Sequence, residues 1–172
     1  MHSAQGMEQQ TAKKNPAKKY DPKEDAEKVA YRTKEGYLMI PGRCIKAAIL
    51  NAAAWYKFGK TSAKQIIAGC TRIEPLQVVI KDSKGKQLKD YVIDMRPVVV
   101  QRSRIIRARP KIEDWQIEFE IIYNDELIGE IDIIRKILEE AGQRIGLLDN
   151  RPQKYGENGT FRVKKFLLVG EA

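Results

Sequence analysis

The chain has almost no histidine, since the one histidine among its 172 residues is His2. We expect residues 1–6 to be an expression-derived addition ahead of a natural start at Met7, in which case the protein itself has none. The scarcity argues against a histidine general base, a histidine metal ligand and a Ser-His-Asp triad. We therefore expect a protein that is not an enzyme.

Cysteine is also scarce, and long apolar runs are missing. Cys44 and Cys70 show no C-x-x-C or Cys/His spacing, so we expect two buried free thiols, no metal and no cofactor. No apolar run approaches the roughly 20 residues of a membrane-spanning helix, and no apolar signal-peptide core follows the N-terminus. We expect a cytoplasmic protein with no membrane partner.

Acidic residues are absent from residues 95–112, which hold six basic side chains, whereas residues 113–141 hold ten acids and two basic residues. The whole chain carries a net charge of +9. Such a basic block is often a solvated face, or an edge strand that resists aggregation. Arginine dominates this block, however, and its planar fork matches phosphate geometry. The separation of the two charge signs therefore favours a polyanion-binding surface.

The apolar periodicity predicts one α+β domain over residues 31–172 behind a flexible tail, residues 1–30, that has few large apolar side chains. A short helix is expected over 62–68. Strands are expected over 37–40, 73–80, 115–123 and 160–169, and longer helices over 43–57 and 131–144. A hairpin over 81–112 is expected between the second and third of these strands. Without the hairpin, this order is the ferredoxin-like β-α-β-β-α-β plan, an antiparallel sheet with two helices on one face. Trp55 and Trp115 are expected to anchor the core.

The arginine-rich part of the hairpin is the first candidate site. In a flat strand, Arg102 and Arg104 lie on one face, while Arg107 and Arg109 lie on the opposite face. We expect a bulge near residues 105–106 to bring all four to one exposed face, with Lys111 beside them.

A second candidate site combines a helix start with a glycine-rich loop. Arg43 and Lys46 lie in the first turns of the helix predicted after Gly42, where backbone N–H groups and the helix dipole favour a phosphate. The loop contributes Arg151, Lys154 and Tyr155, although its glycines, asparagines and proline suit an ordinary connection equally well.

Three stretches carry a family resemblance. Residues 40–43 read IPGR and lead straight into an alanine-rich helix, and the chain later reads IIRKILEEAGQRIG and GTFRV. The order resembles the I-P-G-S-x-x-K-G start of the first helix, the later helix, glycine-rich loop and last strand of the repeat-associated (RAMP) superfamily of CRISPR effector proteins. Arg43 and Cys44 replace that family's paired serines, and Lys46 falls close to its lysine.

The resemblance spans about residues 37–169 and implies a ferredoxin-like backbone subunit. Such a subunit binds single-stranded RNA and assembles along it with further copies of itself or with other effector subunits. Only one insertion, near 81–112, stands in place of the family's larger thumb and lid segments. The superfamily's RNA-cleaving branch uses a histidine, so RNA processing is not expected here. The stretches RPVVVQRSRIIRARP and RPQKYG also resemble small phage proteins.

From these features we expect non-catalytic binding of single-stranded nucleic acid, with RNA favoured, through its phosphates. One alternative is a phage or mobile-element protein that binds single-stranded DNA. A metal-dependent nuclease using Asp94 and Asp149 is an alternative of another class. A further alternative is a structural protein whose acidic segment docks on the basic segment of a second copy, head to tail.

Overall fold

The structure is a computed structural model that describes residues 20–129 and 131–170. The chain divides into two compact units, although the sequence predicted one domain over 31–172. The hairpin unit contains the chain up to Met39 together with Val79–Glu118, and the helical unit contains Ile40–Val78 and the chain from Phe119 onward. The chain passes from one unit to the other within β1 (Met39–Pro41) and returns within β5 (Gln77–Val79). These two strands pair with each other.

The hairpin unit begins with a helix that the sequence did not predict. Helix α2 (Pro22–Val29) starts after Asp21, whose carboxylate accepts a hydrogen bond of 2.9 Å from the Lys23 backbone N–H. A capping aspartate followed by proline is a typical helix start. The expectation of a flexible tail is therefore wrong for residues 22–29. Residues 1–19, with the expected addition at 1–6, lie outside the described residues.

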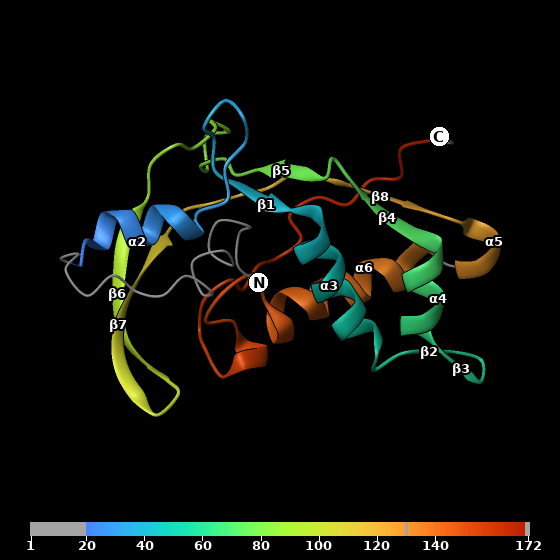
Figure 1. The fold of residues 1–172 in the computed structure, drawn as a ribbon. Helices are drawn as coiled ribbons and strands as arrows, with labels where there is room; N and C mark the ends of the chain where they lie inside the picture. Colours follow the sequence, from blue (N-terminus) through green and yellow to red (C-terminus); the bar gives the residue numbers. More distant parts are fainter. Residues whose placement is uncertain (1–19, 130, 171–172) are drawn as a thin grey trace. The chain divides into compact units, whose positions relative to one another are not determined.

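The predicted hairpin is present. Strands β6 (Val92–Val100) and β7 (Ser103–Lys111) pair antiparallel in an unbroken register, from Val92 opposite Lys111 to Val100 opposite Ser103. They form a long twisted ribbon, with α2 packed near the end away from the turn (Figure 1). The chain between β5 and β6 is a loop closed by short bridges at Lys81, as its polar sequence predicted.

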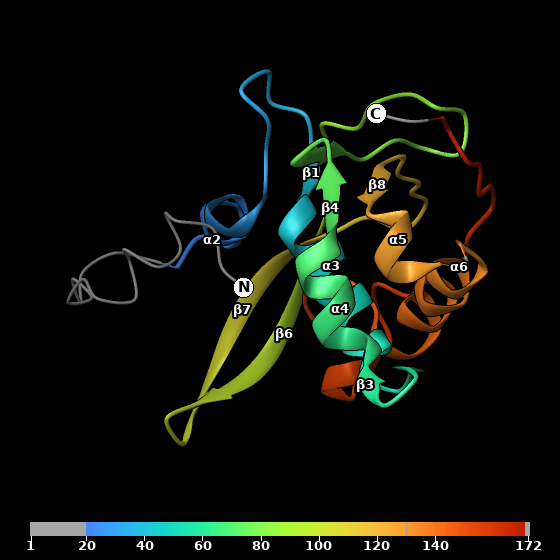
Figure 2. The same cartoon turned by 90° about the vertical axis from the view of Figure 1, so that its right-hand side faces the viewer.

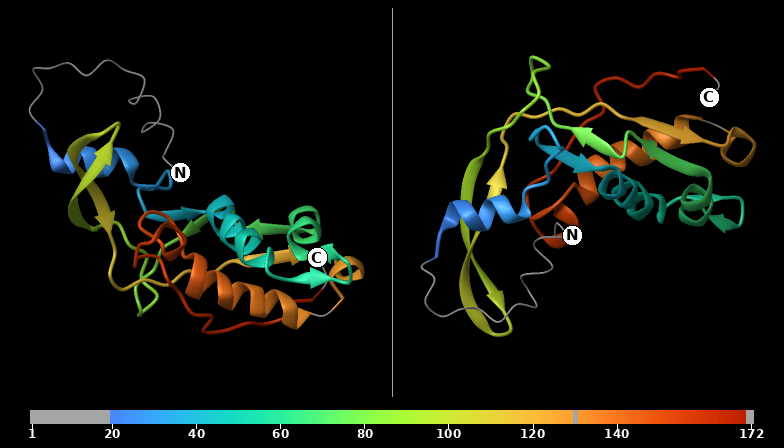
Figure 3. Two further views of the ribbon diagram at one scale, coloured as in Figure 1. Left: turned by 90° about the horizontal axis from the view of Figure 1, so that it is seen from below. Right: turned by 45° about the horizontal axis from the view of Figure 1, so that its top comes forward.

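The helical unit is built on α3 (Gly42–Ala53), α4 (Ala63–Cys70) and α6 (Ile131–Glu140), and α6 continues as a π-helical turn, η1 (Ala141–Ile145). The apolar stripes that predicted these helices are its core, with Ile45, Ile67 and Ile137 almost fully buried. Helices α3 and α6 lie side by side (Figure 3). Strand β4 (Thr71–Glu74) pairs antiparallel with β8 (Glu120–Tyr123), close to the short helix α5 (Asp125–Ile128) and to α4 (Figure 2).

The strands form two-stranded sheets, so the structure is α+β with small antiparallel pairs. The minor pair is β2 (Lys57–Phe58) with β3 (Thr61–Ser62). The closing strand predicted over 160–169 is not formed, and this segment has no regular secondary structure. Its start is held by a loop contact instead, because the Phe161 N–H donates to the Gly142 carbonyl at 3.1 Å. No helix in the described part of the chain is long and apolar enough to cross a membrane.

Candidate nucleic-acid interface

The hairpin turn places the first arginine of the basic block. Gln101 and Arg102 connect β6 to β7 and both have positive φ, 49° and 65°. A two-residue turn with two positive φ angles is the type I′ arrangement, whose twist matches that of the paired strands. The sequence carries no Asn-Gly or Gly-Gly signal at this point, so the turn was not predicted. Arg102 therefore lies in the turn and not on a strand.

The unbroken register overturns the expectation of one shared arginine face. No bulge interrupts β7, so alternate residues point to opposite faces of the ribbon. Arg107 and Arg109 share one face with Lys111, and Arg96 lies opposite Arg107 on the same face. Arg104 belongs to the other face, opposite Val99. The basic side chains therefore surround the ribbon, and the prediction of a common groove is wrong.

Several of these cations have partners within the hairpin unit. Arg96 pairs with Asp94 at 2.6 Å, and the Lys111 ammonium lies 2.9 Å from Glu113. Arg107 lies 3.6 Å from the Asp25 carboxylate of α2. A phosphate would have to compete with these carboxylates. Such exposed ion pairs are individually weak, so a phosphate can displace the carboxylates at a small cost in binding free energy.

Arg102 and Arg104 differ from the other cations of the hairpin. Both are exposed, and neither has an ion pair or hydrogen bond with the described residues. They lie at the turn end of the ribbon, which extends beyond α2 (Figures 1 and 2). This end also exposes apolar side chains, with Val99 69% and Ile106 58% exposed. The turn end is therefore a protruding surface where two guanidinium groups, unpaired among the described residues, lie near exposed aliphatic side chains.

Helix α2 fixes the opposite end of the ribbon. The Asp25 carboxylate accepts a 3.0 Å hydrogen bond from the backbone N–H of Ala108, and Ala108 is fully buried. Tyr91, just before β6, donates a 2.8 Å hydrogen bond to Glu27. Burial and this hydrogen bond raise the pKa of Tyr91 to about 12. The base of the hairpin is thus hydrogen-bonded to α2, and the turn lies at the other end of the ribbon.

The candidate residues of the helical unit form a separate group. Arg43 is exposed in the first turn of α3, and Arg151 comes from the loop after η1. Burial raises the pKa of the neighbouring Cys44 thiol, while the charges of Arg43 and Arg151 act to lower it. The two cysteines are free thiols, as expected, but both are only half-buried.

Lys46 and Arg151 hold the fold of the helical unit. The Lys46 ammonium donates to the carbonyls of Ala68 at 3.0 Å and Thr71 at 2.6 Å, where α4 ends. The Arg151 guanidinium donates to the Leu148 carbonyl at 2.8 Å. A lysine near the C-terminal end of a helix satisfies carbonyls that lack a helical partner. Both cations thus have structural contacts that the sequence did not predict.

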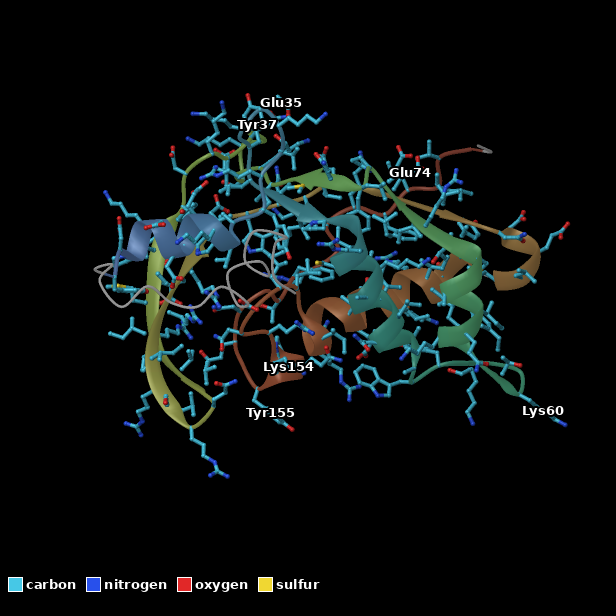
Figure 4. The ribbon with its side chains drawn as sticks, viewed as in Figure 1. Glu35, Tyr37, Lys60, Glu74, Lys154 and Tyr155 are labelled. Carbon is cyan, nitrogen blue, oxygen red and sulfur yellow. The ribbon has the colours of Figure 1, made fainter. Side chains whose placement is uncertain are left out.

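The glycine-rich loop contains a short 3-10 helix, η2 (Pro152–Lys154), after which Tyr155 is fully exposed at a φ of 61°. The side chains of Lys154 and Tyr155 project outward from their own loop (Figure 4). The glycines have a packing role, because a Cβ on Gly156 would lie 2.0 Å from the Asn150 carbonyl oxygen. The close backbone approach explains the glycine without a bound phosphate.

Trp55 is a surface residue that the sequence analysis placed in the core. Helix α3 ends at Ala53, four residues before the predicted end, and Trp55 in the following turn is 52% exposed. The Arg144 guanidinium carbon lies 4.1 Å from the centre of a Trp55 ring, a cation–π contact. Trp115, the second expected anchor, is half-buried.

The carboxylates of the nuclease alternative belong to different units. Asp94 is in the hairpin unit and pairs with Arg96, whereas Asp149 is in the helical unit. Among the described residues, no group of three or more His, Cys, Asp and Glu side chains is placed to hold a metal ion. Compared with models of known protein families, with curated proteins and with solved structures, the chain matches none.

Proposed function

We propose that this protein binds single-stranded nucleic acid, RNA in preference, through phosphate contacts and without catalysing a reaction. The observation that carries the proposal is the turn end of the β6–β7 hairpin, where Arg102 and Arg104 are exposed and unpaired. An arginine without a carboxylate partner loses no ion pair when it takes a phosphate, and its fork binds two phosphate oxygens. Each such contact also releases condensed counterions from the strand.

The remaining basic residues fit a supporting role. Arg107, Arg109 and Lys111 add positive charge on the opposite face of the ribbon, toward α2, and no acid occurs between residues 95 and 112. In the helical unit, Arg43 and Lys154 are exposed and have no hydrogen bond to a described carboxylate. The fully exposed Tyr155 offers a ring on which a base can stack.

The wider proposal is a subunit similar to the backbone proteins of CRISPR effectors, with a ferredoxin-like arrangement in the helical unit. Its support is the IPGR lead-in to α3, the antiparallel pairing of β4 with β8, and the packing of α3 against α6. This resemblance is also the reason for preferring RNA. A phage protein that binds single-stranded DNA uses the same hairpin chemistry and differs in which strand it prefers.

The test is the affinity of the full chain for labelled 20-nucleotide single strands of RNA and DNA, measured by fluorescence anisotropy. Loss of two phosphate contacts in R102A/R104A is expected to weaken binding by about tenfold for every sequence. The matched control is K84A/K86A, which removes the same charge from an exposed loop of the hairpin unit and is expected to change affinity less than about twofold. Wild-type affinity in R102A/R104A would contradict the proposal.

A second readout addresses the nuclease alternative. The same strands, incubated with the protein in Mg²⁺ or Mn²⁺, are expected to stay at full length on a denaturing gel. Cleavage that is lost in D149A would replace the binding proposal with a metal-dependent nuclease.

A further inference from the structure

The turn end of the hairpin exposes more apolar surface than phosphate binding requires. Val99 and Ile106 are mostly exposed on one face of the ribbon, and Val98 and Val100 are partly exposed on the opposite face. Phosphate contacts need cations and backbone N–H groups, not aliphatic side chains. An exposed cluster of aliphatic side chains on a protruding element is typical of a binding surface.

The strand register places these side chains next to an unpaired arginine. Val99 lies directly opposite Arg104, and Ile106 lies directly opposite Pro97. Alternation along the strands puts these four residues on one face of the ribbon, the face that also carries Met95 and Ala108. Near Ala108 the ribbon packs against α2, because Ala108 is buried and its N–H is bound by Asp25. The part from Pro97 to the turn is free of that cover.

We propose that this apolar face, formed by Pro97, Val99 and Ile106, packs against the bases of the strand whose phosphates Arg102 and Arg104 hold. The inference rests on the proposed function and names its ligand more closely: a single strand with unstacked bases. In a continuous duplex the faces of the bases are buried in the stack, whereas a single strand can turn them toward an apolar side chain. Burial of aliphatic surface against a base then adds affinity that salt does not screen.

Charge complementarity selects nucleic acid over a second copy of the chain. Two hairpins packed through this face would bring the Arg104 side chains, and the nearby Arg102 turns, against each other. Residues 95–112 supply no acid to neutralise them. A nucleic acid presents apolar bases and negative phosphates side by side, so it matches both parts of the surface.

The test compares an ordinary single strand with an abasic strand of the same length, which has the same phosphates and no bases. We expect the wild-type chain to bind the ordinary strand about tenfold more tightly. V99T/I106T keeps the β-branched shape at both positions and is expected to lose this preference, with an unchanged affinity for the abasic strand. V92T is the matched control, because Val92 is 61% exposed at the other end of the same ribbon. It is expected to keep the preference.

Three results would overturn the inference. Equal wild-type affinity for both strands would mean that the protein does not contact the bases. The proposed function would still stand in that case, because the protein would still bind the strand. A preference that survives in V99T/I106T would place the base contacts elsewhere. Self-association of the free wild-type chain that V99T/I106T abolishes, measured by sedimentation velocity, would assign the face to a second copy. Failure to bind either strand would instead contradict the proposed function.

Discussion

At the scale of single residues, the ammonium of Lys46 closes the C-terminal end of α4 through its bonds to the Ala68 and Thr71 carbonyls. Lys46→Met keeps the aliphatic stem and removes both bonds. Hydrogen bonds to a charged group contribute about 1.5–3 kcal/mol, so we expect the free energy of unfolding to fall by about that amount. Denaturant unfolding followed by circular dichroism measures it.

The same variant is expected to bind nucleic acid as tightly as the wild type at a temperature where both are folded. Lys64→Met, in an exposed position on α4, is the control for loss of one positive charge. If Lys46→Met has normal stability but binds nucleic acid more weakly, Lys46 is not a structural residue. It would then contact the nucleic acid instead.

Predictions for single residues were correct where the neighbouring sequence alone determines whether a side chain is exposed. Arg102 and Arg104 are exposed, as the high cost of burying unpaired guanidinium groups predicts, but Arg107 and Arg109 are half-buried. Their distribution over the ribbon did not follow, because it depends on a turn at Gln101 and Arg102 that has no glycine or asparagine signal. Trp55 was misplaced for a similar reason, since α3 ends at Ala53 within an alanine-rich run that favours helix beyond that point.

At the scale of elements, helix α2 and the hairpin depend on each other through Asp25. Its carboxylate accepts the Ala108 N–H and also lies near Arg107. In Asp25→Ala the buried N–H of Ala108 loses its acceptor, at a cost of about 1–3 kcal/mol. We expect faster amide hydrogen exchange at Ala108 and along the base of β7.

The control for this substitution is Lys23→Ala, an exposed residue of the same helix, which is expected to leave exchange unchanged. If Asp25→Ala exchanges as slowly as the wild type, α2 is not held to the hairpin by this carboxylate. Nucleic-acid affinity is expected to change only slightly in Asp25→Ala, because Arg102 and Arg104 lie at the other end of the ribbon.

The helices were the most predictable elements. Regular apolar stripes predicted α3, α4 and α6 with errors of a few residues at their ends, because burying a stripe decides where a helix packs. The strands were less predictable. The expected strand over 73–80 is broken into β4 and β5 around Pro75, and the run over 160–169 stays unpaired although its apolar residues favour a strand. Pairing requires a partner edge, and a local pattern does not reveal whether one is free.

At the scale of the whole molecule, opposite charges are concentrated in different parts of the chain. Residues 95–112 carry six basic side chains, and residues 113–141 carry a net excess of eight acids. Contacts between such surfaces are weak and are screened within about 10 Å at 0.1 M salt. We expect the free protein to be monomeric or weakly associated at moderate salt.

A bound strand changes this balance, because it holds successive copies close together and raises their effective concentration. We expect multimers at regular spacing on oligonucleotides several site lengths long. Light scattering with strands of increasing length measures the number of copies bound. One copy per strand at every length would contradict assembly along the strand.

The sequence did not predict the division of the chain into two units. The hairpin unit joins the chain up to Met39 to Val79–Glu118, and the intervening chain folds into the other unit. Length and composition predict how much core a chain can build, but not which distant segments share it. The separation of basic and acidic segments, by contrast, was readable directly from the order of the residues.

The salt dependence of binding shows whether Arg102 and Arg104 hold phosphates. Each phosphate contact to a single strand contributes about 0.7 to the slope of log affinity against log salt concentration. R102A/R104A is therefore predicted to have a slope shallower than that of the wild type by about 1.4, with K84A/K86A unchanged. A wild-type slope in R102A/R104A would contradict phosphate binding by these two arginines, whatever the affinity of the variant at a single salt concentration.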